Sequence, residues 1–415
     1  MLDIFLISLA VLALLSIVFE EVTHLNKAKT TLFFGCIAWV TLFVAAEDPQ
    51  HQKLIAGELN ENLLEIATLW LFLMSTMTFV AYLNAKGMIQ VVVQKLFPQK
   101  VSVRILMIQV ALFSLFLSAI CDNVTATLVS LGLLTTFQLE SQMKRRMAVL
   151  IIFAVNSGGV ALITGDVTTL MIFLEGHVHI SQLLILFIPA AISVTLLATL
   201  FSLKAEGHVS TTPIKRQYNS VDVLIAVIFL ITIVMTMVLN IFFGIPPVLT
   251  FLSGLSIMFL VGTTSRSNKE ELQILEYIRQ VEFDTLLFFL GILLLVGMLK
   301  EIGTLHLLTE VYTKFDPHVS NFVTGIGSAI LDNVPLTAAL LKADPVLTTP
   351  EWLGLTYSVG VGGSLLVIGS AAGIIAMSKV KELTFVSYLK YVPALLLCYS
   401  VGYGLTLFLA IEIFS

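Results

Sequence analysis

The sequence predicts an all-α polytopic membrane protein built from two inverted repeats, each with five transmembrane helices and one re-entrant hairpin. Hydrophobic residues make up 58% of the chain and charged residues 12%, against about 45–50% and about 25% in soluble proteins. Apolar segments of about 20 residues recur along the chain, and each could cross a bilayer. A seven-residue motif that contains an Asp-Asn pair occurs twice within this apolar sequence.

The duplicated motif is the strongest signal of function. Ser-Ala-Ile-Cys-Asp-Asn-Val occupies 118–124 and Ser-Ala-Ile-Leu-Asp-Asn-Val occupies 328–334, so six of seven residues agree across 210 positions. An Asp at the centre of a transmembrane segment costs roughly 2.5 to 3.5 kcal/mol. Two such acids at matching positions predict a pseudosymmetric ion site.

Ten apolar segments are the predicted spans. They are 2–20, 30–46, 64–84, 147–174, 182–203, 221–243, 247–262, 283–299, 351–378 and 384–412. Two further apolar stretches, 101–138 and 318–342, carry the Asp-Asn pairs. A short amphipathic segment precedes each stretch, at 87–97 and 304–315.

Charged loops set the predicted orientation, because Lys and Arg of short loops collect in the cytoplasm. The loops 85–104, 144–146 and 204–220 are basic, whereas 47–62 is acidic and is placed outside. Both termini are then periplasmic, and 206–220 is a cytoplasmic linker.

The same orientation makes 318–342 begin and end outside. At 25 residues the stretch is too short to cross twice, so we expect a re-entrant hairpin. Length does not decide the path of 101–138, and we extend the hairpin to it by symmetry.

Two weaker matches support the internal repeat. Residues 65–72 resemble 282–289, and 156–159 resemble 360–364. The first repeat covers 1–205, with helices in 1–97, hairpin 101–138 and Gly-broken helix 147–174. The second covers 221–415, with hairpin 318–342 and Gly-broken helix 351–378. Five spans separate the starts of the repeats, so the second is inverted, which is a layout of secondary transporters.

The polar residues within these spans are the candidate ligands. Asp122, Asp166 and Asp332 supply carboxylates, and Asn123, Asn333 and Thr168 supply further oxygens of the kind that hard cations prefer. Helix capping is an alternative role for both asparagines and for Asp284. The supporting candidates are Ser118, Thr125, Asn156, Ser157, Asp284, Thr285, Ser328, Thr337 and Ser364.

The acids suggest ion exchange. Desolvation raises the pKa of a carboxyl group and a bound cation lowers it, so one carboxylate can hold a proton or a cation but not both. The sequence has no phosphate-binding Gly-rich loop with Lys, no nucleophile elbow and no His-Glu-x-x-His motif. We therefore expect a transporter without a cofactor rather than an enzyme, and the net charge of −5 gives no reason to expect nucleic-acid binding.

Four motifs, at 118–127, 164–171, 328–337 and 362–373, resemble those of NhaD-type Na⁺/H⁺ antiporters of the ion transporter superfamily. This superfamily also holds arsenite exporters and sodium-coupled dicarboxylate carriers. The resemblance covers about 60–380. It implies a homodimer in the bacterial inner membrane, in which a transport domain with both hairpins moves like an elevator against a scaffold domain that includes the helices of 1–97. It further implies export of Na⁺ or Li⁺ against H⁺. The residues to which it points are Asp122, Asn123, Asp166, Thr168, Asp332 and Asn333, with Ser118, Ser328, Asn156 and Ser364 in support.

Three alternatives remain at this stage. A sodium-coupled anion or arsenite carrier would share the fold, although its site should carry cationic or Ser/Thr-rich tips. An intramembrane aspartyl protease would use two membrane acids, but it would not need duplicated Asp-Asn tips. A channel would conduct far faster than a carrier turns over.

Overall fold

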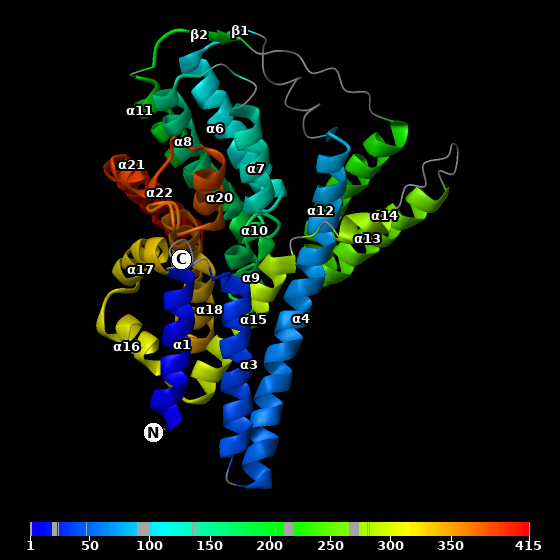
Figure 1. Cartoon of the computed structure of the whole chain (residues 1–415), viewed down its shortest axis with the longest axis vertical. Coiled ribbons are helices and arrows are strands. Elements are labelled where there is room, and N and C mark those ends of the chain that lie inside the picture. The colour runs from blue at the N-terminus through cyan, green and yellow to red at the C-terminus, as the bar shows by residue number, and fades with distance from the viewer. Residues whose placement is uncertain are drawn as a thin grey trace.

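The computed structural model describes residues 2–18, 23, 25–46, 48–88, 100–134, 137, 139–203, 205–210, 219–264, 274–279, 281 and 283–414. This part of the chain is almost entirely helical (Figure 1). Most of the amphipathic segment predicted at 87–97, and most of the linker predicted at 206–220, lie outside the described residues.

The first half of the described chain contains α1 (Leu2–Val18), α3 (Lys27–Ala45), α4 (Pro49–Ala85), β1 (Lys100–Ser102), α6 (Val103–Ile120), α7 (Asn123–Leu134), α8 (Ser141–Gly159), α9 (Val167–Leu174), α10 (Ile180–Leu183), η1 (Leu184–Leu186), α11 (Phe187–Ser202) and β2 (His208–Ser210). The second half contains α12 (Ser220–Phe243), α13 (Pro247–Thr264), α14 (Ile274–Arg279), α15 (Phe283–Glu301), α16 (His306–Lys314), α17 (Pro317–Leu331), α18 (Asn333–Ala343), α19 (Thr349–Gly362), α20 (Ala371–Lys379), α21 (Phe385–Leu389) and α22 (Val392–Phe414).

Two short strands were not predicted from the sequence. β1 and β2 pair antiparallel, with Val101 opposite Val209. Arg104, just after β1, donates from Nε to the carbonyl oxygen of Ala205 at 2.8 Å. These contacts tie the start of α6 to the segment that follows α11.

Seven helices of the described chain are long and apolar enough to cross a membrane. They are Lys27–Ala45, Pro49–Ala85, Val103–Ile120, Ile180–Ser202, Ser220–Phe243, Phe283–Glu301 and Val392–Phe414. Shorter apolar helices lie in α1, α7 and α13. The chain is thus a polytopic helical membrane protein, and the count of ten spans stays a prediction.

The acidic segment that the sequence predicts as a loop at 47–62 is helical from Pro49 onward, where it forms the first part of α4. Asp48 caps this helix by accepting from the backbone N–H of His51 at 2.7 Å, and Pro49 follows at its first position. The Gln, Glu, Lys and Leu residues beyond them are good helix formers. At about 1.5 Å per residue, 37 residues extend about 55 Å, well beyond a bilayer core of about 30 Å.

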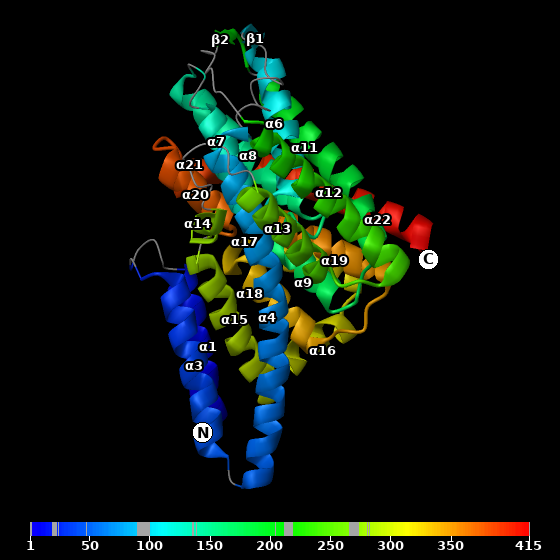
Figure 2. The same cartoon turned by 90° about the vertical axis from the view of Figure 1, so that its right-hand side faces the viewer.

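One group of helices is built around α15, which packs along α3 and contacts α1 and α4 (Figure 2). The α3–α15 crossing is close, because a Cβ on Gly291 would lie 2.3 Å from the backbone N of Leu32. Trp39 also donates from Nε1 to the carbonyl oxygen of Leu294 at 2.8 Å. These contacts hold α3 closely against α15.

A second group contains the two Asp-Asn motifs, each at a break between paired helices. α6 ends before Cys121 and α7 begins at Asn123, whereas α17 and α18 are separated by Asp332 alone. Both breaks point toward the middle of the molecule (Figure 1). The structure therefore has a helix–turn–helix unit where the sequence predicts each hairpin.

The two Gly-broken helices are interrupted as predicted. α8 and α9 are separated by 160–166, and α19 and α20 by 363–370. Each lies against a hairpin through a glycine: a Cβ on Gly158 would lie 2.1 Å from the carbonyl oxygen of Leu115, and one on Gly362 would lie 2.1 Å from that of Gly325.

Candidate functional site

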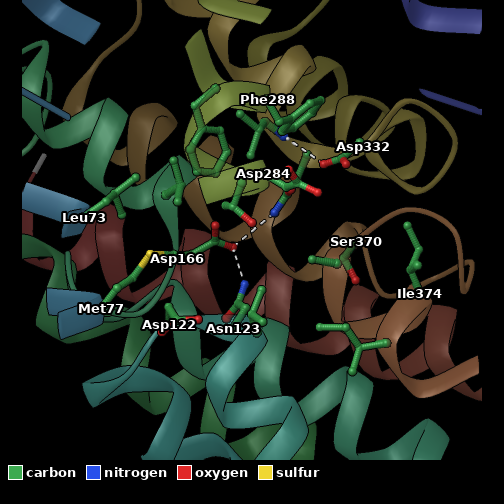
Figure 3. Close-up of a pocket in the computed structure, with 18 of the residues that line it drawn as sticks. Leu73, Met77, Asp122, Asn123, Asp166, Asp284, Phe288, Asp332, Ser370 and Ile374 are labelled. Carbon is green, nitrogen blue, oxygen red and sulfur yellow. Dashed lines mark hydrogen bonds between the residues drawn. The ribbon is translucent and has the colours of Figure 1, made fainter. Parts of the chain in front are cut away.

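A cavity of about 550 Å³ lies where the two hairpin turns meet (Figure 3). Its walls come from both turns, from the irregular segments before α9 and α20, and from the first residues of α3 and α15. The predicted site residues that line it are Asp122, Asn123, Asp166, Asp284, Thr285, Asp332 and Asn333. Predicted site residues as far apart as Asp122 and Asn333 thus share one cavity.

Asp166 occupies the centre of this arrangement. It caps α9, with Oδ1 accepting from the backbone N–H of Thr168 at 3.1 Å. Its Oδ2 accepts from Asn123 Nδ2 at 3.0 Å and from Asn333 Nδ2 at 3.1 Å (Figure 3). The residue is only 5% exposed. Because three N–H groups surround it, the buried carboxylate is satisfied in its ionised form.

The first tip holds its acid through local contacts. Asp122 Oδ1 accepts from the backbone N–H of Thr125 at 2.9 Å, and Oδ2 accepts from the Thr125 hydroxyl at 2.8 Å. This is a cap of α7, which begins at the next residue. Asn123 Oδ1 in turn accepts from the Ser118 hydroxyl at 2.7 Å. Asp122 also borders a second cavity of about 200 Å³, which reaches Asn84 at the end of α4.

The second tip holds its acid differently. Asp332 has a backbone φ of +70°, which is costly for a residue with a side chain. Its Oδ1 accepts only a 3.3 Å bond from the backbone N–H of Val334, and its Oδ2 lies 3.4 Å from Lys27 Nζ. Pro335 stands where the first tip has Thr125, and it has neither an N–H nor a hydroxyl to offer.

Lys27 is the functional candidate that sequence reasoning missed. It lies in the first turn of α3, and its ammonium also sits 4.7 Å from the centre of the Phe288 ring. A lysine just before an apolar run is typical of a loop charge, and its partner lies 305 positions away. Next to it, Asn26 caps α3 and donates from Nδ2 to Asp284 at 2.9 Å.

Three of the supporting residues bond to backbone rather than to the cavity. The hydroxyls of Ser328, Thr337 and Ser364 donate to the carbonyl oxygens of Val359, Asn333 and Val361 at 2.6 to 2.8 Å. These bonds tie side chains of the hairpin and the broken helix to the backbone of the same two elements, and none of the three residues is among those that line the cavity.

Ser370 was also missed. It occupies the N-cap position of α20, without a side-chain capping bond, and lines the cavity, as Asp166 does at the N-cap of α9. Its hydroxyl accepts from Asn156 Nδ2 at 2.9 Å. Matching the Gly-Asp pair at 165–166 with the Gly-Ser pair at 369–370 could have identified Ser370. The two glycines occupy equivalent places, because each lies against the backbone of a hairpin.

Three buried oxygens at the broken helix have no hydrogen-bond partner among the described residues. They are Asn156 Oδ1, Ser157 Oγ and Thr168 Oγ1. Within the same part of the chain, no group of three His, Cys, Asp or Glu side chains could hold a metal ion between them. A cation here would therefore be held by one or two carboxylates together with amide, hydroxyl or backbone oxygens.

Comparisons with known proteins agree on a transporter. The family described as CitMHS, citrate transporter, matches residues 2–360. The Na⁺/H⁺ antiporter NhaD of Vibrio cholerae is 30% identical over 96% of this chain and 90% of its own length. NhaD of Vibrio parahaemolyticus is 29% identical over 91% and 98%, and sodium/proton antiporter 2 of Arabidopsis thaliana is 28% identical over 88% and 90%.

Proposed function

The chain belongs to the CitMHS citrate transporter family, and from this premise we propose that it is a secondary active antiporter that exports Na⁺ or Li⁺ in exchange for H⁺. The observation that carries the proposal is the Asp166 carboxylate, which is bound by an asparagine from each hairpin tip. A cation that enters there can replace the N–H donors, with amide and hydroxyl oxygens turned toward it. The names of the NhaD relatives support the same ions.

Exchange follows from competition for the acids. Asp166 and Asp332 bind the cation when they are ionised and lose it when they are protonated. On the cytoplasmic side the acids release protons and the cation binds, and on the outer side the cation leaves and protons return. Asn123, Asn333 and Thr168 add oxygens around Asp166, while Asp122 closes the edge of the cavity and holds α7.

The moving part in this proposal is the second helix group. α6–α11 and α17–α22 form a transport domain that slides as an elevator against a scaffold of α1–α4 and α12–α15. The equivalent glycine contacts at Gly158 and Gly362 support two inverted repeats within the chain. Among the described residues, two ion pairs join the groups, Lys27–Asp332 and Lys342–Glu65, and both must break when the domain moves.

The proposed setting is the bacterial inner membrane, with both termini periplasmic and two copies of the chain forming a homodimer. The seven apolar helices support membrane insertion. The homodimer and the orientation rest on the family resemblance and on the loop charges.

The test is Na⁺-dependent proton movement in everted vesicles, followed with a pH-gradient dye as Na⁺, Li⁺ and K⁺ are added in turn. The wild-type protein should dissipate the gradient with Na⁺ or Li⁺ and not with K⁺. Asp166→Asn should insert normally and lower exchange by at least about 100-fold, because the charge bound by both tips is lost. Undiminished exchange in Asp166→Asn would remove Asp166 from the mechanism.

A sodium-coupled organic anion carrier is the second candidate, since the family is described as citrate transporters and Lys27 lies in the cavity wall. One ammonium faces four carboxylates there, which favours a cation. Citrate uptake that requires Na⁺ in proteoliposomes, without proton exchange, would reverse this preference.

A further inference from the structure

Lys27 places a protein cation beside an acid of the proposed ion site. Its Nζ lies 3.4 Å from Asp332 Oδ2, and the Lys27 and Asp332 side chains are 20% and 6% exposed. Because Asp332 is nearly buried, its charge needs a partner whenever no transported cation is bound. Lys27 is the cationic side chain within ion-pair distance of Asp332 in the described part of the chain.

The sequence explains why this pair forms at the second tip. At the first tip, both oxygens of Asp122 are taken by Thr125. At the second tip, Pro335 can supply neither of these donors, so Asp332 Oδ2 is open to a cation. The ammonium therefore occupies a position that a transported ion could also use.

Lys27 is held in place from the scaffold side. Asn26 ties the start of α3 to Asp284 of α15, and Phe288 of α15 faces the ammonium. The close α3–α15 crossing fixes this end of the helix. The position of the ammonium is thus set by helices that do not carry Asp332.

We propose that Lys27 is an internal counter-cation, which neutralises Asp332 in the empty carrier and is displaced when Na⁺ or Li⁺ binds. The inference rests on the proposed antiport function. Lys27 is a positioning residue that competes with the substrate for one carboxylate. The apparent affinity for Na⁺ is then lower than the intrinsic affinity, because Na⁺ binding must break the Lys27–Asp332 pair. The more stable this pair is, the weaker the apparent affinity becomes.

The experiment compares Lys27→Gln and Lys27→Arg, with Lys29→Gln and Lys29→Arg as controls on the exposed side of the same turn. Exchange is measured in everted vesicles at one alkaline pH over a range of Na⁺ concentrations. Lys27→Gln should lower the KM for Na⁺ about fivefold, which corresponds to about 1 kcal/mol. Lys27→Arg should raise KM at least about twofold, because a guanidinium pairs more strongly with a carboxylate. The Lys29 variants should match the wild type.

The two Lys27 variants are expected to change the KM for Na⁺ in opposite directions, so either variant alone can test the inference if the other does not fold. An unchanged or increased KM in Lys27→Gln, or an unchanged KM in Lys27→Arg, would overturn it. A purely structural role for Lys27 would lower the maximal rate or the protein yield and leave KM in place.

A second readout separates this inference from the antiport function. The melting temperature of each purified variant is measured against NaCl, with choline chloride holding ionic strength constant. Lys27→Gln should reach half of its Na⁺ stabilisation at about fivefold lower Na⁺. Absence of exchange in the wild type would reject the antiport function, whereas equal Na⁺ dependence of Lys27→Gln and wild type would reject the counter-cation. Stabilisation by citrate that depends on Lys27 would instead identify an anion site and also overturn the proposal.

Discussion

At the first tip Asp122 binds the backbone and hydroxyl of its own helix, whereas at the second tip Asp332 binds a lysine from another helix. The two motifs agree in six of seven residues, and the residue directly after them is Thr125 in one copy and Pro335 in the other. Thr125 supplies both donors that bind Asp122, whereas a proline has neither an N–H nor a hydroxyl to supply to Asp332. We attribute the difference between the two acids to this position.

The largest expected effect comes from substitutions that test whether the two hairpins are packed equally tightly against the broken helices. Gly158→Ala and Gly362→Ala would each place a Cβ 2.1 Å from a backbone carbonyl oxygen. Each should destabilise the protein by about 3 kcal/mol, since backbone cannot move aside as a side chain can. Yield of monodisperse protein and melting temperature provide the measurement.

Gly404→Ala is the matched control, because nothing lies within 4 Å of its added Cβ. If one of the two glycines tolerates alanine and the other does not, the two halves are packed differently. The two tips could then not be compared as equivalent structures.

The next effect contrasts the two acids directly. Asp122→Asn keeps an oxygen that can cap α7, so exchange should fall by no more than about fivefold. Asp332→Asn removes the charge that faces Lys27, and exchange should fall by at least about 20-fold. The measurement is the initial rate of Na⁺-driven gradient collapse, normalised to the amount of inserted protein. Equal losses in both variants would show that the acids have the same role.

The smallest effect probes the residue that distinguishes the tips. Pro335→Thr offers Asp332 the N–H and hydroxyl that Thr125 gives to Asp122. In this background, Lys27→Gln should change the KM for Na⁺ by less than about twofold, because the two substitutions act on the same carboxylate. Pro335→Ala restores the N–H without the hydroxyl and serves as the control. Full retention of the Lys27→Gln effect would mean that Thr125 is not the reason that Asp122 is held locally.

The cavity itself was predictable, because apolar sequence makes each buried acid conspicuous. Asp122, Asp166 and Asp332 were predicted to converge, and all three line the cavity. The breaks in the helices were likewise marked by glycine and by the Asp-Asn pairs.

The partners of these acids were not predictable, because they depend on where helix ends lie relative to the tips. Lys27 meets Asp332 only because α3 begins beside the second tip. No local sequence pattern encodes where a helix begins relative to a distant turn. The same limit applied to α4, whose polar first turns resemble a loop in composition but are helical. Ser370 went unnoticed because a serine carries no charge that stands out in apolar sequence.

The shared hold on Asp166 has a consequence for how ion preference can change. Both asparagines donate to the same oxygen atom of this carboxylate. The surroundings of this oxygen therefore cannot be changed through one helix–turn–helix unit alone. A substitution that enlarges the space next to one asparagine also changes the contacts of the carboxylate with the other asparagine. Under the proposed antiport function, discrimination between small and large alkali ions is therefore a joint property of the two helix–turn–helix units, and a shift in it requires matched changes in both.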